Sequence, residues 1–158
     1  MLQAGEFAPD FDLPALIGGI KGRFRLSECR DRQNVVLVFY PCNWNAVSTE
    51  QMVACQVERE ALQSRDTEIV GISVDSIMNT TAWEREIGPF DYPLCSDFWP
   101  HGEVSRQYGV LRDEGTSERA VFVIDKAGNI KFSRVYSQTQ VPEFSDIIEA
   151  LTRLSSAA

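Results

Sequence analysis

An unbroken run of β-branched and aromatic residues occupies positions 35–40, with the sequence VVLVFY. Because no polar residue alternates with the apolar ones, this run predicts a strand that is buried on both faces of a sheet. Pro41 ends the strand. Farther on, Ser48 and Gln51 have the spacing of a capping box, in which each side chain bonds the other residue's backbone N–H. The pattern therefore predicts a buried strand, a short polar loop and a helix that begins at Ser48.

The apolar positions after Ser48 recur mostly every third or fourth residue, which predicts an amphipathic helix that runs to about Ser64. These positions are Met52, Cys55, Val57, Ala61 and Leu62. Residues 68–74 form a second apolar run, and we expect a strand parallel to the first because a helix connects the two. Asp75 is expected to cap the next helix. The apolar positions of that helix are Ile77, Trp83 and Ile87.

The N-terminal segment alternates apolar and other residues, with Phe7, Pro9, Phe11 and Leu13 at every second position. This alternation predicts a short strand over residues 5–13 at the edge of a sheet, where proline is tolerated. Gly18 and Gly19 supply a turn, and residues 20–26 are expected to return as a second strand. The chain thus opens with a predicted β-hairpin.

The second half of the chain is expected to hold a short strand, a short helix, a hairpin and a terminal helix. Their positions are residues 92–95, a helix closing at Gly109, strands 119–125 and 130–136, and a helix with Pro142 in its first turn. The apolar face of the last helix carries Phe144, Ile147, Ile148, Leu151 and Leu154. This order predicts a thioredoxin-like α/β fold with an N-terminal β-hairpin extension and a central mixed sheet flanked by helices, in a single domain over residues 1–158.

Composition and charge narrow the range of possible functions. The 158 residues are 44% hydrophobic and 24% charged, as in an ordinary globular protein. The net charge of −8 argues against a nucleic-acid or anionic-membrane partner, because phosphate binding requires a basic face. We expect a cytosolic protein, since the first residues lack the features of a signal peptide. The single histidine, His101, and four widely spaced cysteines give no zinc-type pattern, so no metal or cofactor is expected.

The turn from the first buried strand into its helix is the candidate site, because first-turn N–H groups point across the carboxyl end of the strand. The residues here resemble the signature of the peroxiredoxins, Pro-x-x-x-Thr-x-x-Cys with an arginine on a later strand. Pro41 matches the proline and Arg119 matches the arginine. Asn45 stands at the threonine position, and Ser48 stands at the position of the peroxidatic cysteine.

The resemblance covers residues 5–154 and is closest to the one-cysteine, alkyl hydroperoxide reductase E type and its bacterioferritin-comigratory relatives. Its most similar block is PLCSDFWPHG at residues 93–102. The resemblance implies a thiol-dependent peroxidase that reduces hydrogen peroxide or organic hydroperoxides without a cofactor. It also implies a thiol reductant, such as thioredoxin, glutaredoxin or a low-molecular-weight thiol, and a homodimer.

Ser48 conflicts with the reaction that the family performs. In the family, a thiolate attacks the peroxide O–O bond and becomes a sulfenic acid. A hydroxyl is far less acidic and attacks peroxide oxygen poorly, so the chain as written is expected to lack peroxidatic turnover. Either a cysteine has been replaced by serine, or the chain is a natural relative that has lost the reaction. The persistence of Pro41 and Arg119 favours the first explanation.

Two other interpretations stay open. In the first, Ser48 and Gln51 only cap the helix, and the chain is a redox-inactive binding or chaperone module. In the second, the chain is a disulfide exchanger that uses Cys42.

Cys55 lies seven residues after Ser48, roughly 10 Å along a helix, whereas a disulfide spans Cα atoms within roughly 7 Å. Cys55 is therefore expected in the core, and Cys42 is the better candidate for a resolving or reactive thiol. Asn45 either donates an amide hydrogen bond or makes a turn.

Overall fold

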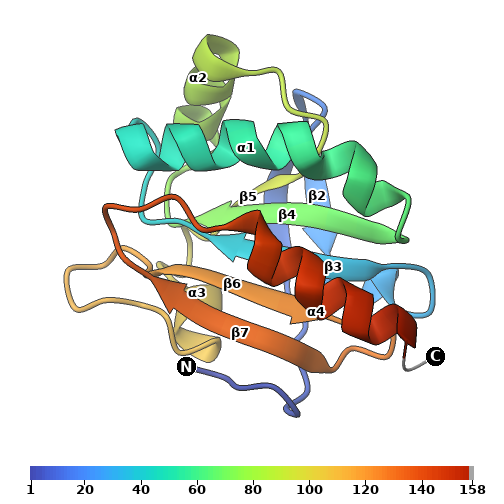
Figure 1. Ribbon diagram of the computed structural model, residues 1–158. Coiled ribbons are helices and arrows are strands. Elements are labelled where there is room, and N and C mark those ends of the chain that lie inside the picture. Colours follow the sequence, from blue (N-terminus) through green and yellow to red (C-terminus); the bar gives the residue numbers. More distant parts are fainter. Residues whose placement is uncertain (157–158) are drawn as a thin grey trace.

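The computed structural model describes residues 1–156, which build a seven-stranded sheet with helices on both faces (Figure 1). The strand order is β2-β1-β5-β4-β3-β6-β7. The strands are β1 (Asp12–Ile17), β2 (Ile20–Arg25), β3 (Asn34–Phe39), β4 (Thr67–Ser73), β5 (Leu94–Ser96), β6 (Arg119–Ile124) and β7 (Ile130–Tyr136). Strands β3, β4 and β5 pair in parallel, and the other pairs are antiparallel. The sheet is therefore mixed, as the sequence predicts.

The helices divide between the two faces of the sheet. They are α1 (Ala46–Gln63), α2 (Ile77–Ile87), α3 (Glu103–Gln107) and α4 (Phe144–Ser156), with a 3-10 helix at Leu26–Cys29. One apolar cluster joins α1, α2 and α4 to the sheet and contains Met52, Trp83 and Leu151. A second cluster lies on the opposite face and contains Val104 and Tyr108 beside α3. In Figure 1, α1 and α4 lie across the front of the sheet and α3 lies behind it.

Strand β3 confirms the prediction of a strand buried on both faces. Val36 and Val38 belong to the cluster beneath α1 and α4, whereas Leu37 and Phe39 belong to the cluster on the other face. Strand β3 pairs in parallel with β4 on one side and antiparallel with β6 on the other. An apolar residue is thus needed at every position, which explains why the run has no alternation.

The first strand lies later in the chain than predicted. β1 spans Asp12–Ile17, and Phe7 makes only an isolated bridge to Asn129. The turn decides this, because Gly18 and Gly19 both have positive φ (59° and 78°) and pairing starts directly beside them. The prediction of an edge strand is also wrong, since β1 lies between β2 and β5.

Three local predictions are wrong for reasons of geometry. The N-cap of α2 is Ser76, and Asp75 instead accepts a hydrogen bond from the Asn43 N–H. Pro142 precedes the first residue of α4 rather than lying in its first turn. Val57 is 74% exposed, because a residue two positions after the buried Cys55 points about 200° around the helix from it.

The β3–β6 pairing creates the corner that holds the candidate site. Phe39 faces Ala120 in this antiparallel pair, so the end of β3 and the beginning of β6 lie at the same edge of the sheet. Pro41 leaves β3 at this edge, and Arg119 enters β6 there. The first turn of α1 begins a few residues after Pro41. Segments far apart in the sequence therefore meet at one end of the central strands.

Candidate active site

The first turn of α1 is capped by Asn45, not by Ser48. The helix begins at Ala46, and the Asn45 Oδ1 atom accepts a hydrogen bond from the Ser48 N–H at 3.0 Å. The predicted capping box of Ser48 and Gln51 is therefore wrong. Of the two roles left open for Asn45, an amide donor or a turn residue, the contacts described show neither directly: its side-chain oxygen accepts hydrogen bonds as the N-cap. An asparagine just before the first turn is a strong N-cap, and this frees the side chains of Ser48 and Gln51 to face the sheet.

Arg119 reaches across the corner and contacts the side chains of that first turn. Its Nη1 atom donates to the Ser48 Oγ at 3.2 Å and to the Gln51 Oε1 at 2.6 Å. Its Nη2 atom donates to the Gln138 carbonyl at 3.2 Å and lies 3.5 Å from the Asn45 Oδ1. The four residues contacted come from α1, its cap and the loop that follows β7. The structure thus brings Ser48, Asn45 and Arg119 together, as the sequence motif predicts.

The corner is positively polarised. Arg119 is completely buried, and burial lowers the pKa of its guanidinium, yet an arginine side chain stays protonated in proteins. The first turn of α1 contains no acidic residue, so the positive end of the helix dipole is not compensated there. A group at position 48 therefore lies beside a full positive charge and a partial one. This is the environment that lowers a thiol pKa.

Ser48 itself is sealed from solvent. Its exposed fraction is 0% and that of Gln51 is 2%. Around it, Cys42 and Asn45 are half-buried and Pro41 is buried. A substrate that reaches position 48 must therefore displace part of the protein that covers Ser48.

The loop before α1 is held by a polar network that the sequence did not reveal. The buried Asn43 accepts a hydrogen bond from the Tyr40 hydroxyl at 2.9 Å and donates to Thr80 at 3.0 Å and Asn79 at 3.1 Å. Its backbone N–H donates to Asp75 at 2.8 Å. The only sequence signal was an asparagine in the short polar segment that follows Pro41. These bonds fasten the loop to the start of α2.

The four cysteines are free thiols, and none is activated by its surroundings. Burial raises the pKa of Cys42, Asp75 raises it further, and only Arg119 opposes them. Cys55 is buried in the core, as expected, and burial raises its pKa to about 12. Burial likewise raises the pKa values of Cys29 and Cys95. Cys42 is the one thiol of the four that is not classed as buried, so it remains the more accessible candidate.

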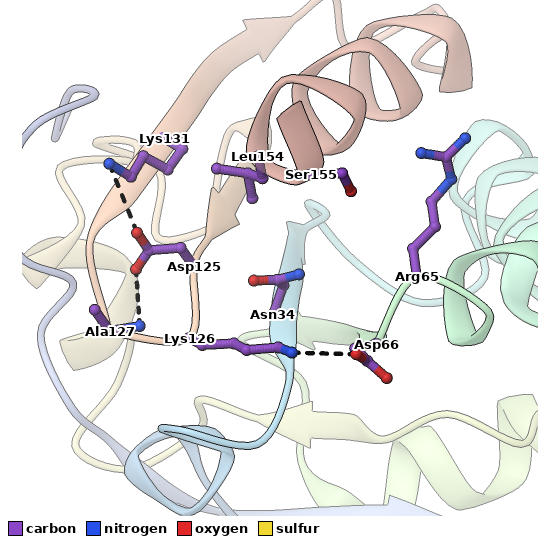
Figure 2. Close-up of a pocket in the computed structure, with 9 residues that line it drawn as sticks. All are labelled: Asn34, Arg65, Asp66, Asp125, Lys126, Ala127, Lys131, Leu154 and Ser155. Carbon is purple, nitrogen blue, oxygen red and sulfur yellow. Dashed lines mark hydrogen bonds and ion pairs between the residues drawn. The ribbon is translucent and has the colours of Figure 1, made fainter. Parts of the chain in front are cut away.

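A cleft lies at the opposite end of β3 from the corner (Figure 2). It has a volume of about 480 Å³ and lies between the start of β3, the β6–β7 turn and the end of α4. Two of its cations are paired, Lys126 with Asp66 at 3.1 Å and Lys131 with Asp125 at 3.6 Å. The third cation, Arg65, donates to the Thr152 hydroxyl at 3.2 Å. Because each cation of the cleft already has a partner, the cleft does not compete with the corner as the candidate site.

Residues 1–156 contain neither a metal-type cluster nor a membrane-type helix. Within that range no group of three or more histidine, cysteine, aspartate or glutamate residues is arranged to hold a metal ion. No helix in the same range has the length and apolar character needed to cross a bilayer.

Comparison with known proteins identifies the family. The family model described as "AhpC/TSA family" matches residues 4–133, which is most of the chain and includes Pro41, Ser48 and Arg119. The chain belongs to the AhpC/TSA family, the peroxiredoxins.

Curated peroxiredoxins resemble the chain over nearly its whole length. Alkyl hydroperoxide reductase E of Mycobacterium tuberculosis is 32% identical over 156 residues, which cover 96% of this chain and 99% of the relative. The chloroplastic 2-cysteine peroxiredoxin of Chattonella marina var. antiqua is 36% identical over 140 residues, covering 85% of this chain and 71% of the relative. The chain is thus similar both to a relative named alkyl hydroperoxide reductase E and to one named a 2-cysteine peroxiredoxin.

Solved structures confirm the thioredoxin-like fold. The reduced 2-Cys peroxiredoxin of Plasmodium vivax has a TM-score of 0.93 at 26% identity, covering 99% of this chain and 83% of that one. Thioredoxin peroxidase I of Plasmodium yoelii has a TM-score of 0.89 at 27% identity, covering 98% and 91%. The peroxiredoxin scaffold is therefore present from the N-terminal hairpin to α4.

Proposed function

We propose that the corner around position 48 is the reaction pocket of a thiol-dependent peroxidase, and that the chain with Ser48 does not turn over. The observation that carries this proposal is the 3.2 Å contact between Arg119 Nη1 and Ser48 Oγ at the N-terminus of α1. The substrates are hydrogen peroxide or organic hydroperoxides. Pro41 walls the pocket, and Asn45 and Gln51 hold its shape.

The chemistry needs a thiolate at position 48. Its sulfur attacks one peroxide oxygen, the O–O bond breaks, and the departing oxygen takes a proton and leaves as water or an alcohol. The product is a sulfenic acid. A first reductant thiol attacks that sulfur and releases water, forming a mixed disulfide; a second thiol then restores the cysteine. Arg119 stabilises the thiolate and the charge that develops on the departing oxygen. A serine hydroxyl forms no comparable intermediate.

The experiment is to restore the thiol. The Ser48→Cys variant is expected to consume peroxide with dithiothreitol or thioredoxin as reductant at least 100-fold faster than free cysteine at pH 7. The unmodified protein gives the baseline. A Ser64→Cys variant is the matched control, since it places a thiol at the exposed opposite end of α1 and is expected to react like free cysteine. A folded Ser48→Cys protein that is no faster than this control would overturn the proposal.

Two rival functions predict different outcomes in the same assay. A redox-inactive binding or chaperone module gains nothing from Ser48→Cys. A disulfide exchanger working through Cys42 already reacts in the unmodified protein and loses that activity in a Cys42→Ser variant. The raised pKa of Cys42 speaks against this second rival, because the thiolate is the reactive form.

We further propose a thiol reductant, a homodimer and a cytosolic location. The reductant is thioredoxin, glutaredoxin or a low-molecular-weight thiol, because the raised pKa values of the chain's own thiols disfavour internal resolution. The homodimer rests on the likeness to other peroxiredoxins. The cytosolic location rests on the four free thiols, which suit a reducing compartment. The net charge of −8 argues against nucleic acid and anionic membranes as partners.

A further inference from the structure

Position 48 is sealed in the folded chain, so a segment that covers it has to move before a substrate arrives. Two loops contact the corner. The β3–α1 loop, residues 41–45, supplies the Asn45 oxygen that accepts from the Ser48 N–H. The β7–α4 loop, residues 137–141, supplies the Gln138 carbonyl that accepts from Arg119. In Figure 1 both loops lie at the end of the sheet where β3 stops. The route of entry depends on which loop opens more easily.

The β3–α1 loop is fastened to buried parts of the fold. Its central residue, Asn43, is buried and bonds to the end of β3, the β4–α2 connection and the first turn of α2. The partners, at 2.8 to 3.1 Å, are Tyr40, Asp75, Asn79 and Thr80. The Trp44 indole N–H adds a bond to Asn79 at 3.0 Å. Opening this loop would take partners away from buried polar groups, which costs their full desolvation penalty.

The β7–α4 loop is held by a single residue. Within residues 1–156, Gln138 makes the only hydrogen bonds between this loop and the rest of the chain. Its carbonyl accepts from Arg119 Nη2 at 3.2 Å, and its Nε2 atom donates to Glu118 Oε2 at 3.3 Å. The other bonds of the loop are internal and join Ser137 to Thr139 and Gln140.

Burial agrees with this difference in attachment. Ser137, Thr139 and Gln140 are exposed, Gln138 is half-buried, and Pro142 is buried just beyond the loop. Segments with few contacts and exposed backbone open locally at a small cost in free energy, whereas well-bonded segments do not. The weaker side of the corner is therefore the β7–α4 loop.

We propose that the β7–α4 loop is a cover over the pocket at position 48, held closed by Gln138, and that its opening sets the size of the peroxide that the pocket admits. With the cover closed, the pocket favours hydrogen peroxide. A bulky organic hydroperoxide requires the loop to move away from Arg119, about hinges at the end of β7 and at Pro142. The choice of substrate rests on the proposed function, whereas the cover is a property of the folded chain.

The test measures access to a thiol in the Ser48→Cys variant. The thiol is alkylated with iodoacetamide or with iodoacetanilide, which has the same reacting carbon and an additional phenyl ring. Peptide mass spectrometry follows position 48 alone. Because both reagents attack the same thiolate, the ratio of their rates does not depend on the thiol pKa. A change in this ratio therefore reports the size of the opening.

The Gln138→Ala change removes the bond to Glu118 and weakens the closed state. In the Ser48→Cys background it is expected to speed iodoacetanilide about fivefold, the effect of losing one hydrogen bond, and iodoacetamide less than about twofold. Glu118→Ala breaks the same bond from the other side and should reproduce the effect. Combining the two changes should add nothing further, because only one bond is lost.

The matched control is Gln140→Ala in the same loop. The exposed side chain of Gln140 makes no hydrogen bond within residues 1–156, so both rates should stay unchanged. Labelling of the buried Cys55 is followed in the same samples and should stay slow, which shows that the variants remain folded. Gln138→Ala rates that match those of Gln140→Ala, or that rise equally for both reagents, would overturn the proposal.

Alkylation needs no turnover, so the cover is tested even where Ser48→Cys consumes no peroxide. Where that variant is active, Gln138→Ala should shift its preference from hydrogen peroxide toward cumene hydroperoxide by about fivefold, for the same reason. An unchanged preference in an active protein would contradict the role of the loop in selecting substrate size.

Discussion

At the scale of single residues, the contact between Ser48 and Arg119 was predictable, but the other residues that contact Arg119 were not. Both residues fall on a sequence motif, so their proximity follows from the resemblance. The roles of Gln51 and Gln138 depend on tertiary structure, because Gln51 turns from the helix end to the guanidinium and Gln138 contributes a backbone carbonyl. Any residue type can supply a backbone carbonyl, so the contact with Gln138 could not be predicted from the sequence.

A thiol introduced at position 48 should report the field of Arg119. In the Ser48→Cys background, Arg119→Gln is expected to raise the thiol pKa toward its ordinary value near 8.5, because the cation adjacent to position 48 is lost. The fraction of thiolate at pH 7 then falls, and alkylation by iodoacetamide slows about tenfold, as expected for a shift of about one pKa unit. The pH dependence of alkylation measures the pKa directly.

The control for this shift is Arg23→Gln in the same background, which removes an exposed cation from the distant β2 strand. It should leave the alkylation profile unchanged. Identical profiles in the Arg119 and Arg23 variants, both folded by circular dichroism, would show that the thiol does not sense the guanidinium.

At the scale of elements, periodicity located most helices and strands, and their ends were less predictable. Continuous apolar runs predict buried strands such as β3 and β4, and the spacing of apolar residues predicts α2. Caps failed because neighbouring polar residues compete: Asn45 took the place given to Ser48, and Ser76 the place given to Asp75. Which of two neighbouring polar residues caps the helix depends on which side chain makes contacts elsewhere in the fold.

The network that ties the loop before α1 to α2 should contribute measurably to stability. Asn43→Ala removes the acceptor of the buried Tyr40 hydroxyl and the donor to Thr80, and is expected to lower the free energy of unfolding by about 2 kcal/mol. Urea denaturation measures the change. Asn34→Ala is the control, because its half-buried amide makes one long bond of 3.4 Å and should cost less than about 0.5 kcal/mol. Equal losses in the two variants would contradict a special role for the network.

At the scale of the whole molecule, the order of the elements predicted the fold class, but the burial of one unpaired carboxyl group could not be predicted from the sequence. The buried Glu84 of α2 faces Gly19 in the β1–β2 turn and has no hydrogen-bond or ion-pair partner among the described residues. Burial raises the pKa of its carboxyl. In the sequence, Glu84 is only the residue after the apolar Trp83. Nothing in the local sequence predicts that the N-terminal hairpin covers its side chain.

This carboxyl should make the stability of the protein depend on pH. Above its ordinary pKa the folded state holds the proton more tightly than the unfolded state, so the free energy of unfolding falls as pH rises through the raised folded-state pKa. Glu84→Gln is expected to raise that free energy by about 1 kcal/mol at pH 7 and to have little effect near pH 4. Urea denaturation across this range checks the slope.

Glu86→Gln is the matched control, since it removes an exposed carboxylate from the same helix. It should change the free energy of unfolding by less than about 0.5 kcal/mol at either pH. A Glu84→Gln variant that is no more stable at pH 7 than this control would show that the buried carboxyl carries no cost.

The antiparallel pairing of β3 with β6 also fixes when the corner can exist during folding. Ser48 and Arg119 are separated by 71 positions, and β4, α2, β5 and α3 lie between them in the chain. A nascent polypeptide that has already formed β3, α1 and β4 still lacks the guanidinium. Contacts of such long sequence separation form only after the intervening loop has closed. The contact between Arg119 and Ser48 therefore forms late in folding, and any truncated chain that ends before β6 lacks the guanidinium beside Ser48.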